Sequence, residues 1–373
     1  MIYLDSAATT FQKPTAVSRA VEQAFYTMSS PGRGGYAEAM AAADMVFDCR
    51  SAIAELYGME DPSRVVFTTN ATHSLNLAIK SLVPPVGQVV ISGWEHNAVT
   101  RPLQALGAKV GTAAGHLFDR EAVLQDFRRC IMPRLHAVVC THVSNVFGFI
   151  LPVEEIADIC RQQGVPLIID ASQSAGCIPL DMKKLGAAFI AMPGHKGLYG
   201  PQGTGVLLCG RSQTQPLLEG GTGSLSVQQE MPDFLPDRLE AGTHNVPGIA
   251  GLLAGVNYVR ERGMESILAH ERKLIRTAAE GLRCMKGVRV YDGDAQAGVL
   301  SFTVEGRDVE QLADALADRG VALRAGLHCA PLAHASAGTL KTGTLRLSVS
   351  DMNTVSEIFR FLNTTEEILD GIF

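Results

Sequence analysis

The apolar positions in the first half of the chain follow two alternating spacings. Short continuous apolar runs, typical of buried strands, occupy residues 64–69, 88–93, 136–143, 165–170 and 187–192. Apolar residues at helical spacing fill 73–82 and 153–164, and the second stretch ends at a glycine, a common helix stop. Apolar strands separated by helices predict a mostly parallel sheet that is covered on both faces.

The pattern changes near residue 258. A long helical stretch at 263–285 leads into short strand-like segments, a helix near 308–319 and a final strand-like segment at 344–350. This mixture is typical of a smaller α+β domain, and 373 residues are enough for two domains. We therefore predict a large domain over 15–258 and a small α+β domain formed by 1–14 with 259–373.

The composition is that of a globular protein, with 46% hydrophobic and 19% charged residues. The formal net charge is -6 and the chain has no lysine- or arginine-rich run, so we expect neither nucleic acid nor a membrane surface as a partner. We find no apolar run of about 18 residues that would span a membrane, and no signal-peptide pattern at the start.

The eight cysteines do not form a C-x-x-C pair and do not combine with histidines at zinc-ligand spacing. Most are expected to be small core residues with free thiols. Free thiols are typical of the cytoplasm, so we predict a cytoplasmic protein without a metal site.

Polar segments follow five of the predicted strands, at 68–74, 92–98, 141–148, 168–176 and 192–205. Ligands of parallel sheets bind outside the carboxyl ends of the strands, so these segments together outline a pocket. Taken one at a time, each segment could equally be an ordinary loop.

The last of these segments contains five glycines and a single lysine, Lys196. Such a glycine density excludes a helix or a central strand. Asp170 ends an apolar run, where a carboxylate needs either a helix N-terminus to cap or a cationic partner. A lysine for a Schiff base and an aspartate beside a pyridinium nitrogen are what pyridoxal phosphate (PLP) requires. The segment 70–74 opens a helix and suits either plain capping or a phosphate.

With these segments in order, the chain resembles the cysteine desulfurases and selenocysteine lyases of the class V aminotransferases. The resemblance is carried by 3–10, 70–74, 95–98, 143–148, 170–176, 194–205, 240–245, 324–330 and 345–354. It implies the PLP-dependent transferase fold type I. In that α/β fold, a large domain with a mostly parallel seven-stranded sheet is joined to a smaller α+β domain that carries the nucleophile cysteine loop.

The resemblance also implies a role for each matching cofactor residue. Lys196 would form the Schiff base with PLP and move the α-proton, and Asp170 would face the ring nitrogen. His96 would stack on the ring and, as a catalytic residue, help to move protons. Gln173 and Asn145 would lie near the ring hydroxyl or the substrate. The phosphate would be held by Ala71, Thr72, His195 and, across a dimer interface, Thr243.

The remaining implied roles concern the substrate. Cys329 would accept the sulfur, and Arg346 would hold the substrate carboxylate through paired hydrogen bonds. A reactive cysteine needs a positive field, which His328 or Arg324 could supply, with Arg324 also placed among the substrate-binding residues. Considered alone, Cys329 could be a small core residue and Arg346 part of a surface ion pair.

Three positions depart from the family pattern. Pro193 stands where a serine is common, Gly32 where a histidine is common before an arginine, and His73 where a glutamate is frequent. These changes bear on the phosphate contacts and the substrate more than on the cofactor. The short stretch between Cys329 and Arg346 resembles the branch with a compact cysteine loop.

We therefore predict a PLP-dependent cysteine desulfurase that converts L-cysteine to L-alanine and leaves a persulfide on Cys329. The alternatives are a selenocysteine lyase, another class V enzyme such as an aminotransferase or a racemase/epimerase, and a non-catalytic scaffold. L-cysteine or a related amino acid is the expected substrate, with a homodimer and a sulfur-acceptor protein as the expected partners.

Overall fold

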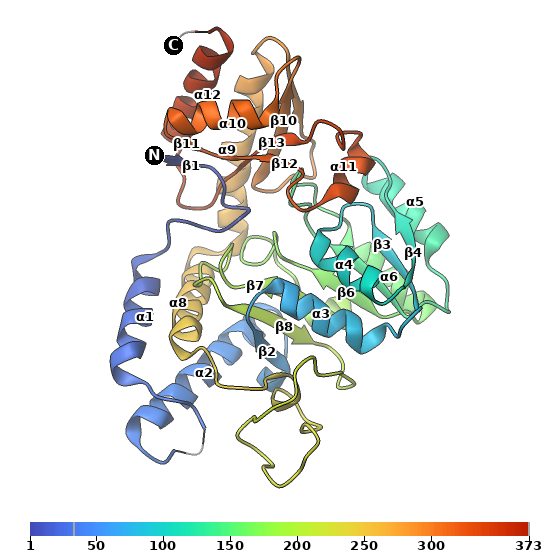
Figure 1. Cartoon of the computed structure of the whole chain (residues 1–373), viewed down its shortest axis with the longest axis vertical. Helices are drawn as coiled ribbons and strands as arrows, with labels where there is room; N and C mark the ends of the chain where they lie inside the picture. The colour runs from blue at the N-terminus through green and yellow to red at the C-terminus, as the bar shows by residue number, and fades with distance from the viewer. Residues whose placement is uncertain (33, 372–373) are drawn as a thin grey trace.

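The computed structural model describes residues 1–32 and 34–371 (Figure 1). Seven strands form one large sheet in the order β2-β8-β7-β6-β5-β3-β4. Neighbouring strands from β4 to β7 are parallel, and β8 is antiparallel to both β7 and β2. The strands are β2 (Val65–Thr68), β3 (Gln88–Ser92), β4 (Lys109–Ala113), β5 (Ala137–Thr141), β6 (Leu167–Asp170), β7 (Phe189–Pro193) and β8 (Gly205–Cys209). The predicted seven-stranded, mostly parallel sheet is confirmed.

Both faces of this sheet are buried because successive strand residues alternate between two cores. Leu167 and Ile169 of β6 join one hydrophobic cluster, whereas Ile168 between them joins the other. One face is covered by α3 (Ala71–Leu82) and α4 (Asn97–Ala105). The opposite cluster takes residues from α2 (Ala37–Leu56), α5 (Arg120–Cys130), α6 (Val153–Gln163), α7 (Met182–Leu185) and α8 (Val246–Arg262).

The C-terminal part contains a four-stranded antiparallel sheet in the order β12-β13-β10-β9. Its strands are β9 (Val288–Tyr291), β10 (Val299–Val304), β12 (Arg324–Gly326) and β13 (Thr344–Ser348). The helices of this part are α9 (Met264–Arg283), α10 (Val309–Asp318), α11 (Pro331–Ala337) and α12 (Val355–Leu369). Gly263, at φ 82°, separates α9 from α8.

The N-terminal residues lie beside this C-terminal part (Figure 1). Strand β1 (Ile2–Tyr3) pairs in parallel with β11 (Val321–Ala322), and Leu4 joins the hydrophobic cluster of α9, α12 and β10. The chain then crosses to α1 (Thr15–Thr27), which packs against α8. The first ten residues therefore run between the two parts of the molecule.

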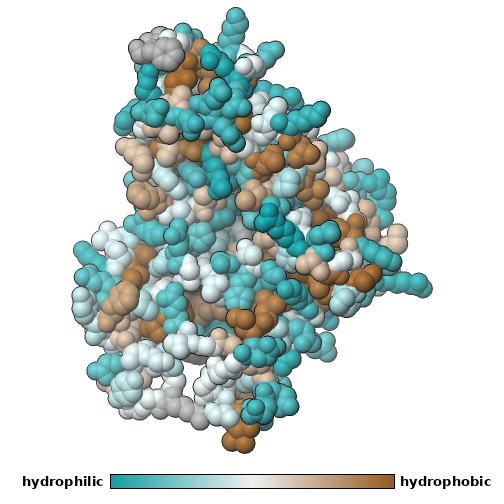
Figure 2. Space-filling view, in the orientation of Figure 1, coloured by the Kyte–Doolittle hydropathy of each residue, from teal (hydrophilic) through white to brown (hydrophobic). Residues whose placement is uncertain are grey.

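Figure 2 shows apolar side chains interspersed with hydrophilic ones on this face, including a group over α1. Two aromatic side chains of α1 are exposed, Phe25 at 71% and Tyr26 at 83%. Across the described residues, no helix combines the length and apolar character needed to cross a membrane.

Candidate active site

A cavity of about 210 Å³ lies at the carboxyl edge of the large sheet. It brings together side chains from the ends of four strands, the start of α3 and the β12–α11 loop. Every residue predicted for the site except Thr243 lines it: Ala71, Thr72, His96, Asn145, Asp170, Gln173, His195, Lys196, Arg324, Cys329 and Arg346. The segments outlined by the sequence are thus collected at one edge, as expected for parallel strands.

Lys196 follows β7 in a loop that the N-terminal segment holds in place. Thr10 donates from its backbone to the carbonyl of His195 at 3.1 Å, and its hydroxyl donates to the carbonyl of Lys196 at 3.2 Å. Burial, and then the charge of Arg346, lower the pKa of Lys196 to about 8, although the charge of Asp170 acts in the opposite direction. The amine is therefore neutral more often than an ordinary lysine at neutral pH.

The glycines of this loop make close approaches to protein backbone. A side chain at Gly197 would lie 2.2 Å from the carbonyl oxygen of Ala175, and one at Gly205 would lie 2.6 Å from the backbone of Asn70. These glycines therefore pack the lysine loop against two other site segments.

Asp170 is the last residue of β6 and is only 2% exposed. Its Oδ1 accepts hydrogen bonds from the backbone N–H of Ser172 at 2.9 Å and from the Ser172 hydroxyl at 2.5 Å. No helix begins at this point in the described chain, so the helix-cap interpretation of Asp170 is wrong. Within the described residues no protein donor bonds Oδ2, which leaves one carboxylate oxygen for a ligand in the cavity.

His96 caps the start of α4 through its ring. Its Nδ1 accepts the backbone N–H of Ala98 at 3.0 Å, so the neutral ring carries its proton on Nε2. Burial lowers the pKa of His96, with Asp170 acting in the opposite direction. A neutral, half-buried imidazole in the cavity wall suits stacking on a planar ligand.

Glu95, which the sequence analysis did not identify, supports this part of the site. It is fully buried, and its Oε1 accepts the backbone N–H of Thr141 at 2.7 Å and the hydroxyl of Ser92 at 2.5 Å. Burial above all raises the pKa of Glu95 to about 8, and the charge of Asp170 adds to that rise. Glu95 therefore joins the ends of β3 and β5 as a mainly neutral acid. The sequence clue to Glu95 was its position directly before the predicted site residue His96.

The beginning of α3 offers free backbone donors. Asn70 caps the helix by accepting the N–H of His73 at 2.9 Å, and Ala71 and Thr72 in the first turn face the cavity. His195 lies in the same cavity with its Nδ1 3.0 Å from the hydroxyl of Thr9. Burial, and then the charge of Lys196, lower the pKa of His195 to about 4. This end of the cavity thus combines backbone and side-chain donors suited to an anion.

Arg346 enters the cavity from β13 and is 2% exposed. Its Nη2 donates to Oδ1 of Asp5 at 2.5 Å, and its Nη1 donates to the carbonyl of Asn145 at 3.1 Å. The surface ion pair considered from the sequence is therefore wrong, because the arginine is buried. Asp5 lies in the N-terminal segment that carried the family resemblance, but no local sequence pattern indicates this pairing.

Cys329 is exposed in a tight turn between β12 and α11. Cys329 and His328 adopt positive φ values of 56° and 49°, which non-glycine residues rarely do. The turn is fixed because the backbone N–H of Asn97 donates to the carbonyl of Cys329 and the side chain of Asn145 donates to that of His328, both at 2.8 Å. This geometry is the compact cysteine loop expected from its length.

His328 points away from solvent toward β13, where its Nε2 lies 3.1 Å from the carbonyl of Thr344. Burial, and then the charge of Arg346, lower the pKa of His328 far below its usual value. The neutral ring cannot supply the positive field proposed for Cys329. Arg324, an exposed residue of the cavity wall without an ion pair to any described residue, remains the cation that can supply it.

Thr243 lies outside this cavity in the single chain. It is exposed and lines a neighbouring cavity together with His73. The segment is held by Glu240, whose carboxylate is paired with Arg50 and lies 2.7 Å from His244. A contact of Thr243 with a phosphate across a dimer interface remains a prediction.

The other two departures from the family pattern are Pro193 and Gly32. Pro193 ends β7, pairs with Gly205 of β8 and lines the cavity, so it supplies an apolar wall where a hydroxyl is common. Gly32 is described, but the arginine after it, at position 33, lies outside the described residues.

The groups that line this cavity fit PLP. A partly buried amine can bond its aldehyde, the unbonded oxygen of Asp170 can receive a ring N–H, and the start of α3 can take its phosphate. In addition, the arginines lining the same cavity suit a carboxylate.

Known structures share this architecture from end to end. The apo structure of a cysteine desulfurase from Thermococcus onnurineus NA1 superimposes with a TM-score of 0.91 at 31% identity, covering 100% of this chain and 95% of that one. The cysteine desulfurase CsdA from Escherichia coli gives a TM-score of 0.87 at 29% identity, with coverages of 100% and 95%. The fold and site thus define a protein of the PLP-dependent transferase fold type I.

The chain belongs to the class-V aminotransferase family, whose model matches residues 2–361. A probable cysteine desulfurase of Methanothermobacter thermautotrophicus is 32% identical over 384 residues, spanning 98% of this chain and 94% of that protein. A probable cysteine desulfurase of Mycolicibacterium paratuberculosis is also 32% identical, over 390 residues. The match includes 100% of this chain but 56% of that longer protein.

Proposed function

We propose that the protein is a PLP-dependent cysteine desulfurase. The observation that carries this proposal is that Lys196, the buried carboxylate of Asp170 and the exposed thiol of Cys329 share one cavity. The relatives named as cysteine desulfurases support it, since they match nearly the whole chain.

In this reaction, L-cysteine and the thiol of Cys329 give L-alanine and a persulfide on Cys329. The bond between the β-carbon and sulfur of the substrate breaks, a sulfur–sulfur bond forms on Cys329, and the β-carbon gains a proton in place of the sulfur. PLP, when bound, supplies the electron sink that makes the α-proton removable.

The protein residues prepare these steps. Lys196, with its pKa lowered to about 8, takes the proton from the substrate α-carbon. Arg346 and Arg324 line the cavity where the substrate carboxylate would lie, and Asn145 anchors the turn that presents Cys329. Asp170 holds one carboxylate oxygen for the ring nitrogen. Ala71, Thr72 and His195 would receive the phosphate, with Gln173 beside the ring.

The proposal is tested by mass spectrometry of PLP-loaded protein exposed to L-cysteine, followed by peptide mapping. We expect one additional sulfur on Cys329 together with stoichiometric alanine. The Cys329→Ala variant should lose both, while Cys284→Ala, which removes another exposed thiol, should lose neither. Persistent sulfur release at the parent rate from Cys329→Ala would exclude this thiol as the acceptor.

A selenocysteine lyase is the second candidate, because it would use the same cavity residues. The compact, hydrogen-bonded turn around Cys329 leaves the acceptor thiol in a fixed position for either substrate. Parallel assays of alanine from cysteine and from selenocysteine separate the two. An aminotransferase or a racemase would produce neither sulfide nor persulfide from cysteine.

We further propose a cytoplasmic homodimer that passes its persulfide sulfur to an acceptor protein. Thr243 is exposed near the start of α3, and the apolar side chains of Phe25 and Tyr26 are exposed on α1. Burial of such side chains favours association with a second copy. Sedimentation of the purified protein tests the dimer, and a monomer at micromolar concentration would contradict it.

A further inference from the structure

Lys13 lies just before the start of α1, and its side chain is half-buried. Its ammonium group donates to the carbonyl and to the hydroxyl of Thr10, both at 3.0 Å. Both acceptors are neutral groups. Lys13 forms no ion pair with a carboxylate of any residue that the structure describes.

This position is unfavourable for a cation. A positive charge beside the N-terminus of a helix is repelled by the helix dipole, and the first turn of α1 holds no acidic residue to offset it. Burial also disfavours the ammonium form, and it lowers the pKa of Lys13 to about 8. The two hydrogen bonds to Thr10 are therefore the contacts through which Lys13 can act.

Thr10 connects Lys13 to the lysine loop. Its backbone N–H donates to the carbonyl of His195 at 3.1 Å, and its hydroxyl lies 3.1 Å from that carbonyl and 3.2 Å from the carbonyl of Lys196. Because the ammonium group of Lys13 can only donate, the Thr10 hydroxyl oxygen accepts from it. The single proton of that hydroxyl is then left for the carbonyls of the loop. Lys13 thus orients the bond that holds the backbone at 195–196.

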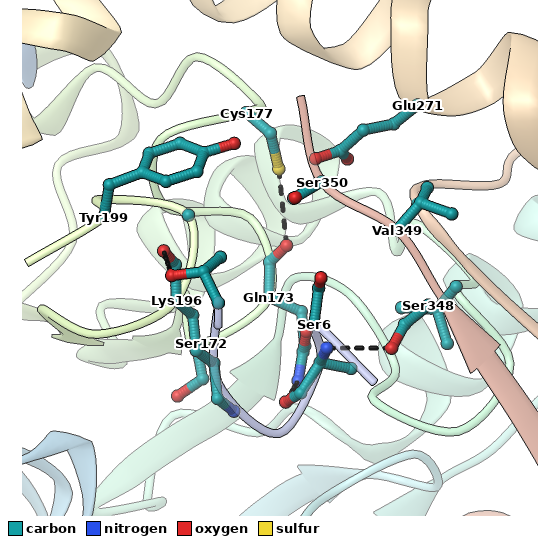
Figure 3. Close-up of a pocket in the computed structure, with 15 residues that line it drawn as sticks. Ser6, Ser172, Gln173, Cys177, Lys196, Tyr199, Glu271, Ser348, Val349 and Ser350 are labelled. Carbon is teal, nitrogen blue, oxygen red and sulfur yellow. Dashed lines mark hydrogen bonds between the residues drawn. The ribbon is translucent and has the colours of Figure 1, made fainter. Parts of the chain in front are cut away.

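The geometry also shows that Lys13 stands behind Thr10 and not in the site itself. Figure 3 shows the N-terminal segment running from Ser6 toward the loop that carries Lys196. Thr10 and Lys196 both line the small cavity drawn there, of about 30 Å³. Lys13 lines neither this cavity nor the one that contains Asp170.

The same segment also affects the ring of His195. The hydroxyl of Thr9 lies 3.0 Å from its Nδ1. Burial, and then the charges of Lys196 and Lys13, lower the pKa of His195 to about 4. Residues 9–13 therefore contact both the ring of His195 and the backbone that carries Lys196.

We propose that Lys13 is a positioning residue for Lys196, which it holds in place through Thr10. The inference rests on the proposed role of Lys196 as the amine that binds the cofactor. Without Lys13, the Thr10 hydroxyl is free to turn toward water, the loop loosens, and water reaches the amine. Because burial is the main cause of the lowered pKa of Lys196, that pKa should then rise.

The first test follows the amine of Lys196 in the cofactor-free, full-length protein. Trace reductive methylation at several pH values, with peptide mapping of residue 196, gives the midpoint of its titration. Lys13→Met keeps a long side chain without an N–H donor and should move this midpoint to higher pH by about 1 pH unit. Thr10→Val should do the same. Lys286→Met, which removes an exposed lysine, should leave the midpoint unchanged.

This readout separates positioning from a purely structural role. If Lys13 only stabilised the start of α1, Lys13→Met would lower the resistance to urea but leave the titration of Lys196 at its parent midpoint. That result would overturn the proposal.

PLP binding to the same proteins provides the second test. Losing a hydrogen bond from a charged donor should weaken PLP binding about tenfold in Lys13→Met, and Thr10→Val should weaken it about as much. If Lys13 acts through Thr10, the double variant should lose little more than either single variant. Neither test uses cysteine, so both stand even if desulfuration fails. A double variant that binds PLP about a hundredfold more weakly than the parent would mean independent effects and would refute the inference.

Discussion

At the scale of single residues, the site is defined by how neighbouring charges set the state of Lys196. Arg346 and Arg324 disfavour its ammonium form, whereas Asp170 and Asp5 favour it. The pKa of Lys196 therefore depends on the opposing charges of two arginines and two aspartates. Substituting any one of them changes its protonation in a direction that follows from the charge removed.

Asp170→Asn provides a direct check of this balance. Because the Asp170 charge raises the pKa of Lys196, its removal should shift the titration of the amine to lower pH. The midpoint can be followed by reductive methylation of cofactor-free protein and peptide mapping of residue 196. Arg324→Gln should move the same midpoint to higher pH, and equal midpoints in all three proteins would refute the electrostatic account.

Asp5 is the second residue for which a substitution has a clear expectation. Removing its carboxylate leaves the buried guanidinium of Arg346 without its ionic partner, which should reduce the free energy of unfolding by on the order of 3 kcal/mol. Asp5→Asn keeps a hydrogen-bond acceptor and should cost less than Asp5→Ala. Urea unfolding measures both, and equal stability of Asp5→Ala and the parent would mean that water replaces the pair.

At the scale of elements, the lysine loop packs closely against the start of α3 because position 205 is a glycine. Gly205→Ala would place a methyl group 2.6 Å from the Asn70 backbone, so the cap of α3 must move. We expect a loss of about 1–3 kcal/mol of stability and weaker PLP binding. Gly111→Ala in β4 is the matched control, because its new methyl group meets Val90 at an ordinary 3.4 Å. Equal effects of the two substitutions would contradict this explanation.

The elements themselves were largely readable from the sequence. The periodic stretches gave β2, β3, β5, β6 and β7 within a few residues, together with α3, α6, α9 and α10. Strand β4 was missed because most of its residues are solvent-exposed at the sheet edge, which leaves no apolar run to detect. Strand β8 was missed because it follows the glycine-rich loop directly.

Site residues could be predicted from the sequence only where the residue type or a local motif indicated a particular chemistry. Lys196, Asp170 and Cys329 lie in recognisable segments, whereas Asp5, Glu95 and Glu271 depend on contacts between distant parts of the chain. Asp5 and Arg346 are separated by 341 positions. No local pattern specifies such a pair, and the buried position of Glu271 depends on the space that Gly298 leaves.

At the scale of the whole molecule, we propose that the two predicted domains meet near Gly263, which separates α8 from α9. A cavity of about 30 Å³ lies where these parts adjoin, with the buried carboxyl group of Glu271, on α9, on one side and the lysine loop on the other. The protonation of this acid should therefore affect the stability of the entire chain.

The sign of that effect follows from the raised pKa. Glu271 titrates at about 8 in the folded protein but near 4.3 when unfolded, so the folded state binds more protons between these values. Its contribution to the free energy of unfolding therefore falls as pH rises from about 4.3 to about 8. Glu271→Gln should gain stability relative to the parent across this window. Urea unfolding at several pH values measures the gain, and a pH-independent difference would refute it.

The pairing of residues 2 and 5 with distant positions of the C-terminal part has a consequence for biosynthesis. These two residues are translated more than three hundred codons before their partners, Val321 and Arg346. At about 5–20 residues per second, the amino-terminal strand waits roughly 15–70 s before it can dock. The large sheet can form before then, whereas the end of the cavity that contains Arg346 is completed only after β13 has been translated.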